Sequence, residues 1–255
     1  MKMNSVINIS RINLTYSTEN GSLQVLKNLN LSVKEGEFLS IIGPSGCGKS
    51  TLLKLIGDLL QPTDGEILIK GKTPSISRKE RKFGFVFQDP VLFEWRTVLK
   101  NVQLPAEIFG DNHIKAKSQQ FVDLVGLSGF ENALPKQLSG GMQSRVAIAR
   151  ALIYEPEILL MDECFGDLDE ITRDRMNLEL LRIWENTHQT IVFVTHSIPE
   201  AVFLSDRVAV MSPRPSKISE MIEVDIERPR KISSKNLPRF IEITKMLRDK
   251  LEIEF

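Results

Sequence analysis

Residues 38–51 read FLSIIGPSGCGKST, and this stretch decides the fold expected of the chain. The apolar run at 38–42 is typical of a strand that is buried on both faces of a sheet. Beyond the glycine-rich loop, apolar side chains recur at helical spacing from Ser50 to Leu60, and the turn residues at 61–65 should end that helix. The stretch therefore predicts a strand, a loop and a helix in direct succession.

The loop matches the pattern G-x-x-x-x-G-K-[ST], which binds phosphate groups when a strand precedes it and a helix follows. Glycines allow successive backbone N–H groups to turn toward an anion, and the N-terminus of the helix adds a partial positive charge. We expect Lys49 to pair with the β- and γ-phosphates and the Ser50 hydroxyl to bind Mg²⁺. The alternative is a glycine-rich turn with an exposed lysine, which the flanking elements disfavour. The residues expected to contact the nucleotide here are Gly43, Pro44, Ser45, Gly46, Cys47, Gly48, Lys49, Ser50 and Thr51.

Two carboxylates, Asp162 and Glu163, follow a second apolar run at residues 158–161. Ligands of open α/β sheets bind at the carboxyl ends of the strands, so both side chains should lie near the phosphate loop. We expect Asp162 to hold Mg²⁺, directly or through water, and Glu163 to act as the general base toward water. An isolated Asp-Glu pair is more often a solvated turn, but the preceding strand favours the catalytic interpretation.

The bulk composition excludes several classes of protein. With 33 basic and 33 acidic residues, the chain has no net charge that would attract nucleic acid, and we expect no such partner. Cys47 and Cys164 form neither a disulfide framework nor a CxxC metal site, which suits a reducing compartment. No run approaches the length of a membrane span, and the first ten residues lack the apolar core of a signal peptide. We expect a cytosolic chain whose membrane contact is peripheral.

The remaining elements follow from periodicity. Alternating residues before position 40 predict β structure, and residues 98–151 have a helical pattern that Pro105, Gly126, Gly129 and Pro135 should interrupt. A strand at 221–226 and a final helix from about Leu237 are also expected. The apolar stripe of that helix favours packing on the core over binding a regulatory partner.

The segment LSGGMQ at 138–143, together with the phosphate loop and the Asp162-Glu163 pair, resembles the ATPase subunit of an ABC transporter. Locally, Ser139 is also compatible with an ordinary helix cap. The resemblance implies an α/β fold with a P-loop NTPase core of the ABC ATPase type, an antiparallel β subdomain and an inserted α-helical subdomain. It also implies a head-to-tail dimer, in which each copy closes over the ATP held by the other. The residues expected to contact that ATP are Ser139, Gly140, Gly141 and Gln143.

The same resemblance assigns four more roles. Tyr16 should stack on adenine, although a half-buried strand tyrosine is the alternative. Gln88 should sense both Mg²⁺ and the attacking water, and His196 should contact the γ-phosphate. Asp169 should contact the phosphate loop of the partner. The segment at 164–169, which follows Glu163, departs from the family pattern at two positions. Cys164 stands where relatives usually have proline, and Asp167 stands where they usually have alanine, at the expected dimer interface.

The resemblance implies one ABC ATPase domain over residues 1–255. Residues 1–88 and 156–226 should form the ATP-binding core with the β subdomain, 89–155 the helical signature subdomain, and 227–255 a helical tail. The motifs at 87–90, 95–98 and 211–215 resemble the importer branch for nitrate, aliphatic sulfonates, taurine and thiamine-pyrimidine precursors. Phe93 and Trp95 should border a groove for a membrane subunit, unless both aromatic rings belong to the core of the lobe.

The implied partners are integral membrane permease subunits, a second copy of the chain and, indirectly, a solute-binding protein. The implied place is the cytoplasmic face of the membrane, and the implied cofactors are ATP and Mg²⁺. Two other functions remain open at this point. One is an ABC-type ATPase of DNA repair or translation, which the single cassette without a long insertion disfavours. The other is a nucleotide-gated regulator without turnover. His113 and His188 have no motif context and should lie on the surface.

Overall fold

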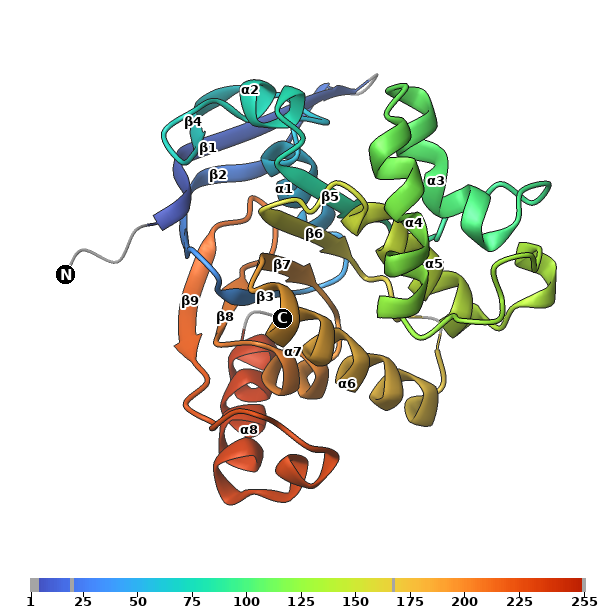
Figure 1. The fold of residues 1–255 in the computed structure, drawn as a ribbon. Coiled ribbons are helices and arrows are strands. Elements are labelled where there is room, and N and C mark those ends of the chain that lie inside the picture. The colour runs from blue at the N-terminus through green and yellow to red at the C-terminus, as the bar shows by residue number, and fades with distance from the viewer. Residues whose placement is uncertain (1–4, 19–20, 167, 254–255) are drawn as a thin grey trace.

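The computed structural model describes residues 5–18, 21–166 and 168–253. Two sheets carry the fold (Figure 1). The smaller sheet is antiparallel with the strand order β2-β1-β4. Its strands are β1 (Ser5–Thr18), β2 (Gly21–Lys34) and β4 (Asp64–Ile69). The long β1–β2 hairpin agrees with the β structure predicted for this region.

The larger sheet has six strands in the order β5-β6-β7-β3-β8-β9. Only the last pair, β8 and β9, is antiparallel. The strands are β3 (Phe38–Ile42), β5 (Phe83–Val86), β6 (Ile158–Asp162), β7 (Thr190–Val194), β8 (Arg207–Met211) and β9 (Ile218–Glu223). Every residue of β3, β6 and β7 is buried, as the apolar runs at 38–42 and 158–161 predicted for β3 and β6.

Each central strand sends alternate side chains into two different cores, because successive residues of a strand face opposite sides of the sheet. From β3, Phe38 and Ile42 enter the core that packs against most of the helices. Leu39 and Ile41 enter the core shared with the antiparallel sheet and helix α1. The carboxyl ends of these strands are therefore fixed from both faces, which gives the loops that follow them a rigid base.

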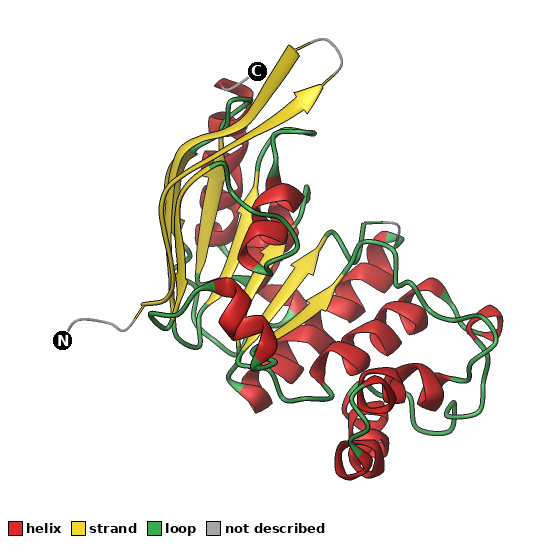
Figure 2. Cartoon of the chain, turned by 90° about the horizontal axis from the view of Figure 1, so that it is seen from above, coloured by secondary structure: helices red, strands yellow, loops and turns green. Residues whose placement is uncertain are grey.

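The antiparallel sheet lies on one side of the molecule, and the lobe of helices lies on the other (Figure 2). The α-helices are α1 (Lys49–Ile56), α2 (Pro74–Lys79), α3 (Val98–Ile108), α4 (Asn112–Leu124), α5 (Gly140–Leu152), α6 (Glu170–Thr187), α7 (Ile198–Leu204) and α8 (Pro238–Ile253). Helix α2 lies next to the antiparallel sheet (Figure 1). Short 3-10 helices span Pro135–Gln137 and Ile232–Asn236. Helices α3, α4 and α5 pack on one another and form a separate lobe (Figure 1).

The final helix packs on the core, as its apolar stripe predicted. Phe240, Ile243 and Leu247 of α8 are buried, and α8 lies against α7. The strand before it is β9, which begins and ends three residues earlier than the predicted range 221–226. Within the described residues, no helix is both long enough and apolar enough to cross a membrane.

Two predicted helix boundaries were wrong. Pro105 does not interrupt the lobe, because it lies inside α3 near its C-terminal end. A proline there removes a single helical hydrogen bond, and its own carbonyl still accepts one from the N–H of Phe109. The helix after the phosphate loop ends at Ile56 rather than near Leu60, with Gly57 as its C-cap. Leu59, which was counted in the apolar stripe, is 48% exposed.

Candidate functional site

The loop between β3 and α1 forms a concave turn that has no room for side chains at its glycines. Gly46 and Gly48 have φ angles of 72° and 119°, which glycine adopts without strain. A Cβ on Gly48 would lie 2.9 Å from a methyl group of Val25, and one on Gly43 would lie 2.9 Å from the carbonyl oxygen of Met211. A narrow backbone cradle of this kind fits a chain of phosphate groups.

Lys49 is the first residue of α1, and its ammonium folds back over this loop. Its Nζ donates hydrogen bonds to the carbonyl oxygens of Gly43 (3.0 Å) and Pro44 (3.2 Å) and lies 3.8 Å from Oε1 of Glu163. The lysine is only 5% exposed. The loop therefore holds a fixed positive charge beside its backbone amides, as the motif predicted.

Ser50 and Asp162 meet across the sheet edge. The Ser50 hydroxyl donates a 2.8 Å hydrogen bond to Oδ1 of Asp162, which is the last residue of β6 and is 6% exposed. Burial raises the pKa of Asp162, and the hydrogen bond from Ser50 offsets part of that rise. One hydroxyl and one carboxylate fit Mg²⁺, which takes one or two protein oxygens together with phosphate and water oxygens.

Glu163 lies at the mouth of the same site and faces His196. Its φ is 44°, an unusual angle for a residue with a side chain, and its N–H donates to the carbonyl of Val194 (2.9 Å). Oε2 of Glu163 is 3.3 Å from Nδ1 of His196, and the two side chains are 20% and 55% exposed. A carboxylate held here reaches solvent, as a general base toward water requires.

No hydrogen bond or ion pair among the described residues joins Gln88 or Tyr16 to this group. Gln88 is exposed just beyond β5, the strand that pairs with β6, so it lies at the same sheet edge as Asp162. Tyr16 is 37% exposed on β1 and pairs with Leu23 of β2. Strand β2 also carries Val25, which packs on the phosphate loop. The exposed tyrosine ring can therefore accept a stacking partner beside the loop.

A second cluster of expected residues lies at the starts of α5 and α6. Ser139 caps α5 by accepting a hydrogen bond from the N–H of Met142 (3.4 Å), and Asp169 caps α6 by accepting one from Thr172 (3.0 Å). A Cβ on Gly141 would lie 3.1 Å from a methyl group of Thr172. The two helix N-termini are therefore side by side. Gly140 follows Ser139, and Gln143 donates to the carbonyl of Pro135 (3.0 Å).

No hydrogen bond or ion pair joins the two clusters within residues 5–18, 21–166 and 168–253. The structure brings together Lys49, Ser50, Asp162, Glu163 and His196 as one group. It brings together Ser139, Gly141 and Asp169 as another. Asp167, the additional charge noted in the sequence, lies outside the described residues. A single chain therefore presents two half-sites rather than one enclosed pocket.

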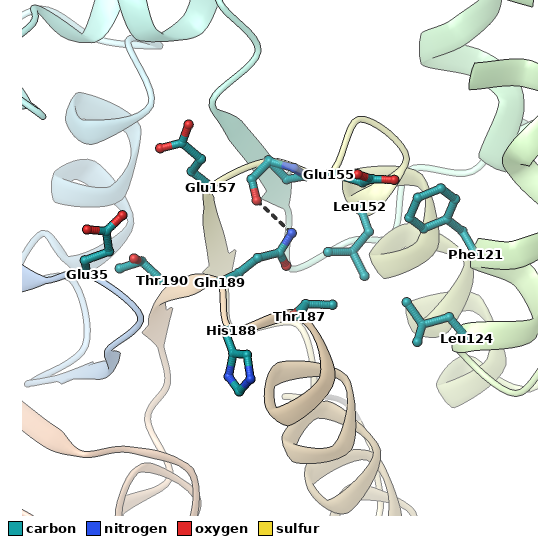
Figure 3. Close-up of a pocket in the computed structure, with 11 residues that line it drawn as sticks. Glu35, Phe121, Leu124, Leu152, Glu155, Glu157, Thr187, His188, Gln189 and Thr190 are labelled. Atoms are coloured by element: carbon teal, nitrogen blue, oxygen red, sulfur yellow. Dashed lines mark hydrogen bonds between the residues drawn. The ribbon is translucent and has the colours of Figure 1, made fainter. Parts of the chain in front are cut away.

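A pocket of about 410 Å³ lies elsewhere (Figure 3). It opens where β6 and β7 begin, and Gln189 closes one side by donating to the carbonyl of Pro156 (2.7 Å). Phe121 and Leu124 of α4 form the apolar wall. Asp162 is at the opposite end of β6, so this cavity is separate from the candidate site. His188, at the rim, is exposed, and so is His113, as predicted.

The sequence did not indicate Arg214 and Ser216, although both border the phosphate loop. A Cβ on Gly46 would lie 3.0 Å from Nη2 of Arg214, so this guanidinium adds positive charge beside the loop. The Ser216 hydroxyl donates to the carbonyl of Cys47. Cys47 itself is buried, and burial raises the pKa of its thiol, as it does for Cys164. Arg214 lies in the motif at 211–215, but the resemblance gave it no role at the site, and Ser216 lies just beyond that motif. The fold therefore reveals the contact of both residues with the phosphate loop.

Comparison with known proteins identifies the family. A family model described as ABC transporter matches residues 26–166. The aliphatic sulfonates import ATP-binding protein SsuB of Bacillus cereus is 44% identical over 246 residues, which are 96% of this chain and 96% of that protein. An uncharacterized ABC transporter ATP-binding protein of Methanocaldococcus jannaschii is 47% identical over 231 residues, 90% of this chain and 86% of that protein.

Solved structures agree with this result. A dimeric post-hydrolysis state of the ATP-binding cassette MJ0796, bound to ADP and Pi, has a TM-score of 0.75 at 36% identity and covers 87% of this chain and 100% of that chain. CbiO1 from Clostridium perfringens, part of the transporter complex cbiONQ, has a TM-score of 0.78 at 25% identity and covers 98% of both chains. The predicted fold class is confirmed, and the chain belongs to the ABC transporter family, as an ATP-binding subunit that hydrolyses ATP.

Proposed function

We propose that this chain energises an importer of small anionic solutes, with aliphatic sulfonates as the first candidate class. The similarity to the sulfonate import proteins of Bacillus supports this class. The cargo does not have to touch the ATPase subunit, so the assignment depends on relatives and not on a residue of the site. The ATPase activity is supported by one observation. At one edge of the sheet, the Ser50 hydroxyl binds Asp162 and the Lys49 ammonium lies beside Glu163.

In this proposal each residue of the first half-site has a separate task. The loop amides and Lys49 bind the β- and γ-phosphates of ATP, while Tyr16 stacks on the adenine ring. Ser50, Asp162 and Gln88 hold Mg²⁺, which neutralises charge on the phosphate oxygens when it is bound. Glu163 takes a proton from the attacking water, and His196 orients Glu163 and contacts the γ-phosphate.

The second half-site acts on the nucleotide of another copy. Ser139, Gly140, Gly141 and Gln143 present the positive N-terminal end of α5, and a helix end of this kind attracts a phosphate. Asp169 contacts the phosphate loop of the partner. The separation of the two clusters within one chain supports a head-to-tail dimer with two nucleotides between the copies. The dimeric cassette among the solved relatives supports a dimer.

The proposal extends to the partners and to the division of the chain. Permease subunits in the membrane bind the groove bordered by Phe93 and Trp95, whose rings lie 4.9 Å apart, and Trp95 is 76% exposed. A solute-binding protein delivers the cargo to the permease. The chain works on the cytoplasmic face. Residues 1–88 and 156–226 act as the core, 89–155 as the signature lobe, and 227–255 as the tail.

The substitution Glu163→Gln tests the proposal. It keeps the size and hydrogen-bonding capacity of the side chain but removes the proton acceptor. We expect ATP binding to persist, phosphate release to fall by at least about 100-fold, and an ATP-bound dimer to accumulate in size-exclusion chromatography with light scattering. Glu242→Gln on the surface of α8 is the matched control. Hydrolysis by Glu163→Gln at the parental rate would remove Glu163 from the general-base role.

A further inference from the structure

A buried carboxylate lies directly behind His196. Glu200, in the first turn of α7, is 4% exposed. Its Oε2 accepts a hydrogen bond from the hydroxyl of Thr195, which is itself buried. The same hydroxyl accepts a 3.0 Å hydrogen bond from the N–H of Ser197. One carboxylate therefore fixes, through a single hydroxyl, the residues on both sides of His196.

The backbone around His196 is anchored on its outer sides as well. The N–H of Thr195 donates to the carbonyl of Ile41 in β3 (3.2 Å), which ties the turn to the strand before the phosphate loop. On the other side, the Ser197 hydroxyl accepts from the N–H of Glu200 (3.4 Å) and caps α7. The imidazole itself is 55% exposed, and Glu163 is the one residue among those described that pairs with it through a polar contact. A ring this exposed depends largely on the turn for its direction.

Burying the carboxyl group of Glu200 at this position costs free energy of folding. The neighbouring residues of α7, Val202 and Phe203, are also buried. Burial raises the pKa of Glu200, and Thr195, Arg173, His196 and Asn177 offset only part of that rise. Its second oxygen, Oε1, has no hydrogen-bond partner in the part of the chain that the structure describes. An apolar side chain of similar volume would avoid this cost, so a role in stability does not explain the carboxylate.

We propose that Glu200 is a positioning residue for His196, acting through Thr195. The acceptor oxygen of Glu200 holds the Thr195 hydroxyl in the orientation that binds the N–H of Ser197. This geometry keeps the turn closed and holds the imidazole within reach of Glu163. Glu200 touches neither substrate nor metal in this arrangement. The inference rests on the role of His196 given under the proposed function.

Two pairs of substitutions distinguish a role of Glu200 in positioning His196 from a role in the stability of the fold. Glu200→Leu and Thr195→Val each remove one half of the hydrogen bond, and each should lower kcat for ATP hydrolysis roughly tenfold while KM for ATP stays within twofold or so of the parent. Glu200→Gln and Thr195→Ser keep an acceptor oxygen and a donor hydroxyl, so both should stay within about threefold of the parental kcat. The unfolding midpoint is measured for all four variants by circular dichroism. Should Glu200→Leu fail to fold, Thr195→Val still tests the inference.

A variant without the imidazole, His196→Ala, tests whether Glu200 acts through His196. In His196→Ala, assayed in single turnovers with excess protein, adding Glu200→Leu should cause no further loss, because residues that act through one another are not additive. A further tenfold loss would overturn the inference. If His196→Ala hydrolysed ATP at the parental rate, the role of His196 given under the proposed function would be wrong, and the positioning role of Glu200 would be wrong with it. If His196→Ala were slow but Glu200→Leu and Thr195→Val matched the parent, only the positioning role would fall.

Discussion

The hydroxyl of Ser50 donates a hydrogen bond to Asp162 across 112 positions of sequence. Ser50 lies on α1, which follows β3, and Asp162 ends β6, while β7 lies between β3 and β6 in the sheet. Helix α1 crosses over this strand, and a Cβ on Gly57 at the end of α1 would lie 3.2 Å from Leu160 of β6. The direction of α1 therefore sets the distance between the two oxygens that fit Mg²⁺.

Replacing Ser50 tests that pairing. Ser50→Ala removes the hydroxyl and leaves Asp162 buried without its hydrogen bond, so we expect ATP hydrolysis to fall at least about tenfold and to need more Mg²⁺. Ser50→Thr keeps the hydroxyl and should stay near the parental rate. The measurement is the steady-state rate of phosphate release over a titration of Mg²⁺. A parental rate for Ser50→Ala at low Mg²⁺ would exclude this hydroxyl from the metal site.

Arg230 fastens the tail to the core. Its buried guanidinium donates to carbonyl oxygens of residues 202, 203, 205, 224 and 226, at the end of α7 and beyond β9. Burial lowers the pKa of Arg230 to about 10, so it keeps its charge at neutral pH. Arg230→Leu leaves these carbonyls without partners and should lower the free energy of unfolding by about 3 kcal/mol.

Urea unfolding followed by circular dichroism measures this loss. Arg239→Leu on the surface of α8 is the matched control, because among the described residues that side chain forms ion pairs with Asp225 and Glu242 alone, both of them exposed. The control should leave the midpoint nearly unchanged. An equal effect of the two substitutions would show that the buried carbonyls do not depend on Arg230.

Glu157 gives a prediction of pH dependence. Hydrogen bonds from Lys70 and then Lys82 lower its pKa. Because the pKa is lower in the folded chain than in the unfolded one, Glu157 stabilises the fold above the ordinary glutamate pKa, and this contribution is lost as the pH falls through the lowered value. Glu157→Gln should therefore reduce the stability at pH 7, and its difference from the parent should shrink as the pH falls below the ordinary glutamate pKa of about 4.3.

The effect of Glu157→Gln at pH 7 should be below about 1 kcal/mol, because water screens a pair that is one-third exposed. Thermal unfolding at several pH values measures it. The control is Glu155→Gln, since the exposed Glu155 makes no ion pair among the described residues. A difference between Glu157→Gln and the parent that was as large at pH 3 as at pH 7 would contradict the electrostatic explanation.

Trp95 gives a prediction about the permease. Its ring is largely exposed beside Phe93, so Trp95→Ala should leave the ATPase rate and unfolding midpoint of the isolated subunit unchanged. Co-purification with the permease should weaken at least about tenfold, as is common for an aromatic residue at the centre of an interface. Ile241→Ala, at a 58% exposed position of α8, is the control and should keep full association. Normal association of Trp95→Ala would place the permease elsewhere.

The strands that were predictable from the sequence are those that are buried on both faces. Residues 38–42, 158–161 and 191–194 are continuous apolar runs because both faces of a central parallel strand are buried. Among the site residues, Lys49 and Asp162 were predictable because the chemistry of phosphate and Mg²⁺ fixes residue type and spacing.

The elements that sequence reasoning missed are short or begin with a proline. Helix α2 begins at Pro74 and α7 has Pro199 near its start, where proline suits a first helical turn but resembles a loop signal in sequence. Strand β8 begins with Arg207, and a charged residue at this point made the short apolar run at 208–211 difficult to recognise as a strand. That charge is acceptable because Arg207 pairs with Glu37. Contacts between residues distant in sequence decide each of these cases.

The place of β3 has a consequence for how the protein is made. Its neighbours β7 and β8 span residues 190–194 and 207–211, so a ribosome must add most of the remaining chain before the strand can pair. At ordinary synthesis rates this takes on the order of 10 s. During that time the residues that lead into the phosphate loop are an unpaired apolar segment. Chaperone capture and aggregation compete for the nascent chain there, so slow translation upstream of residue 190 should lower the yield of active subunit.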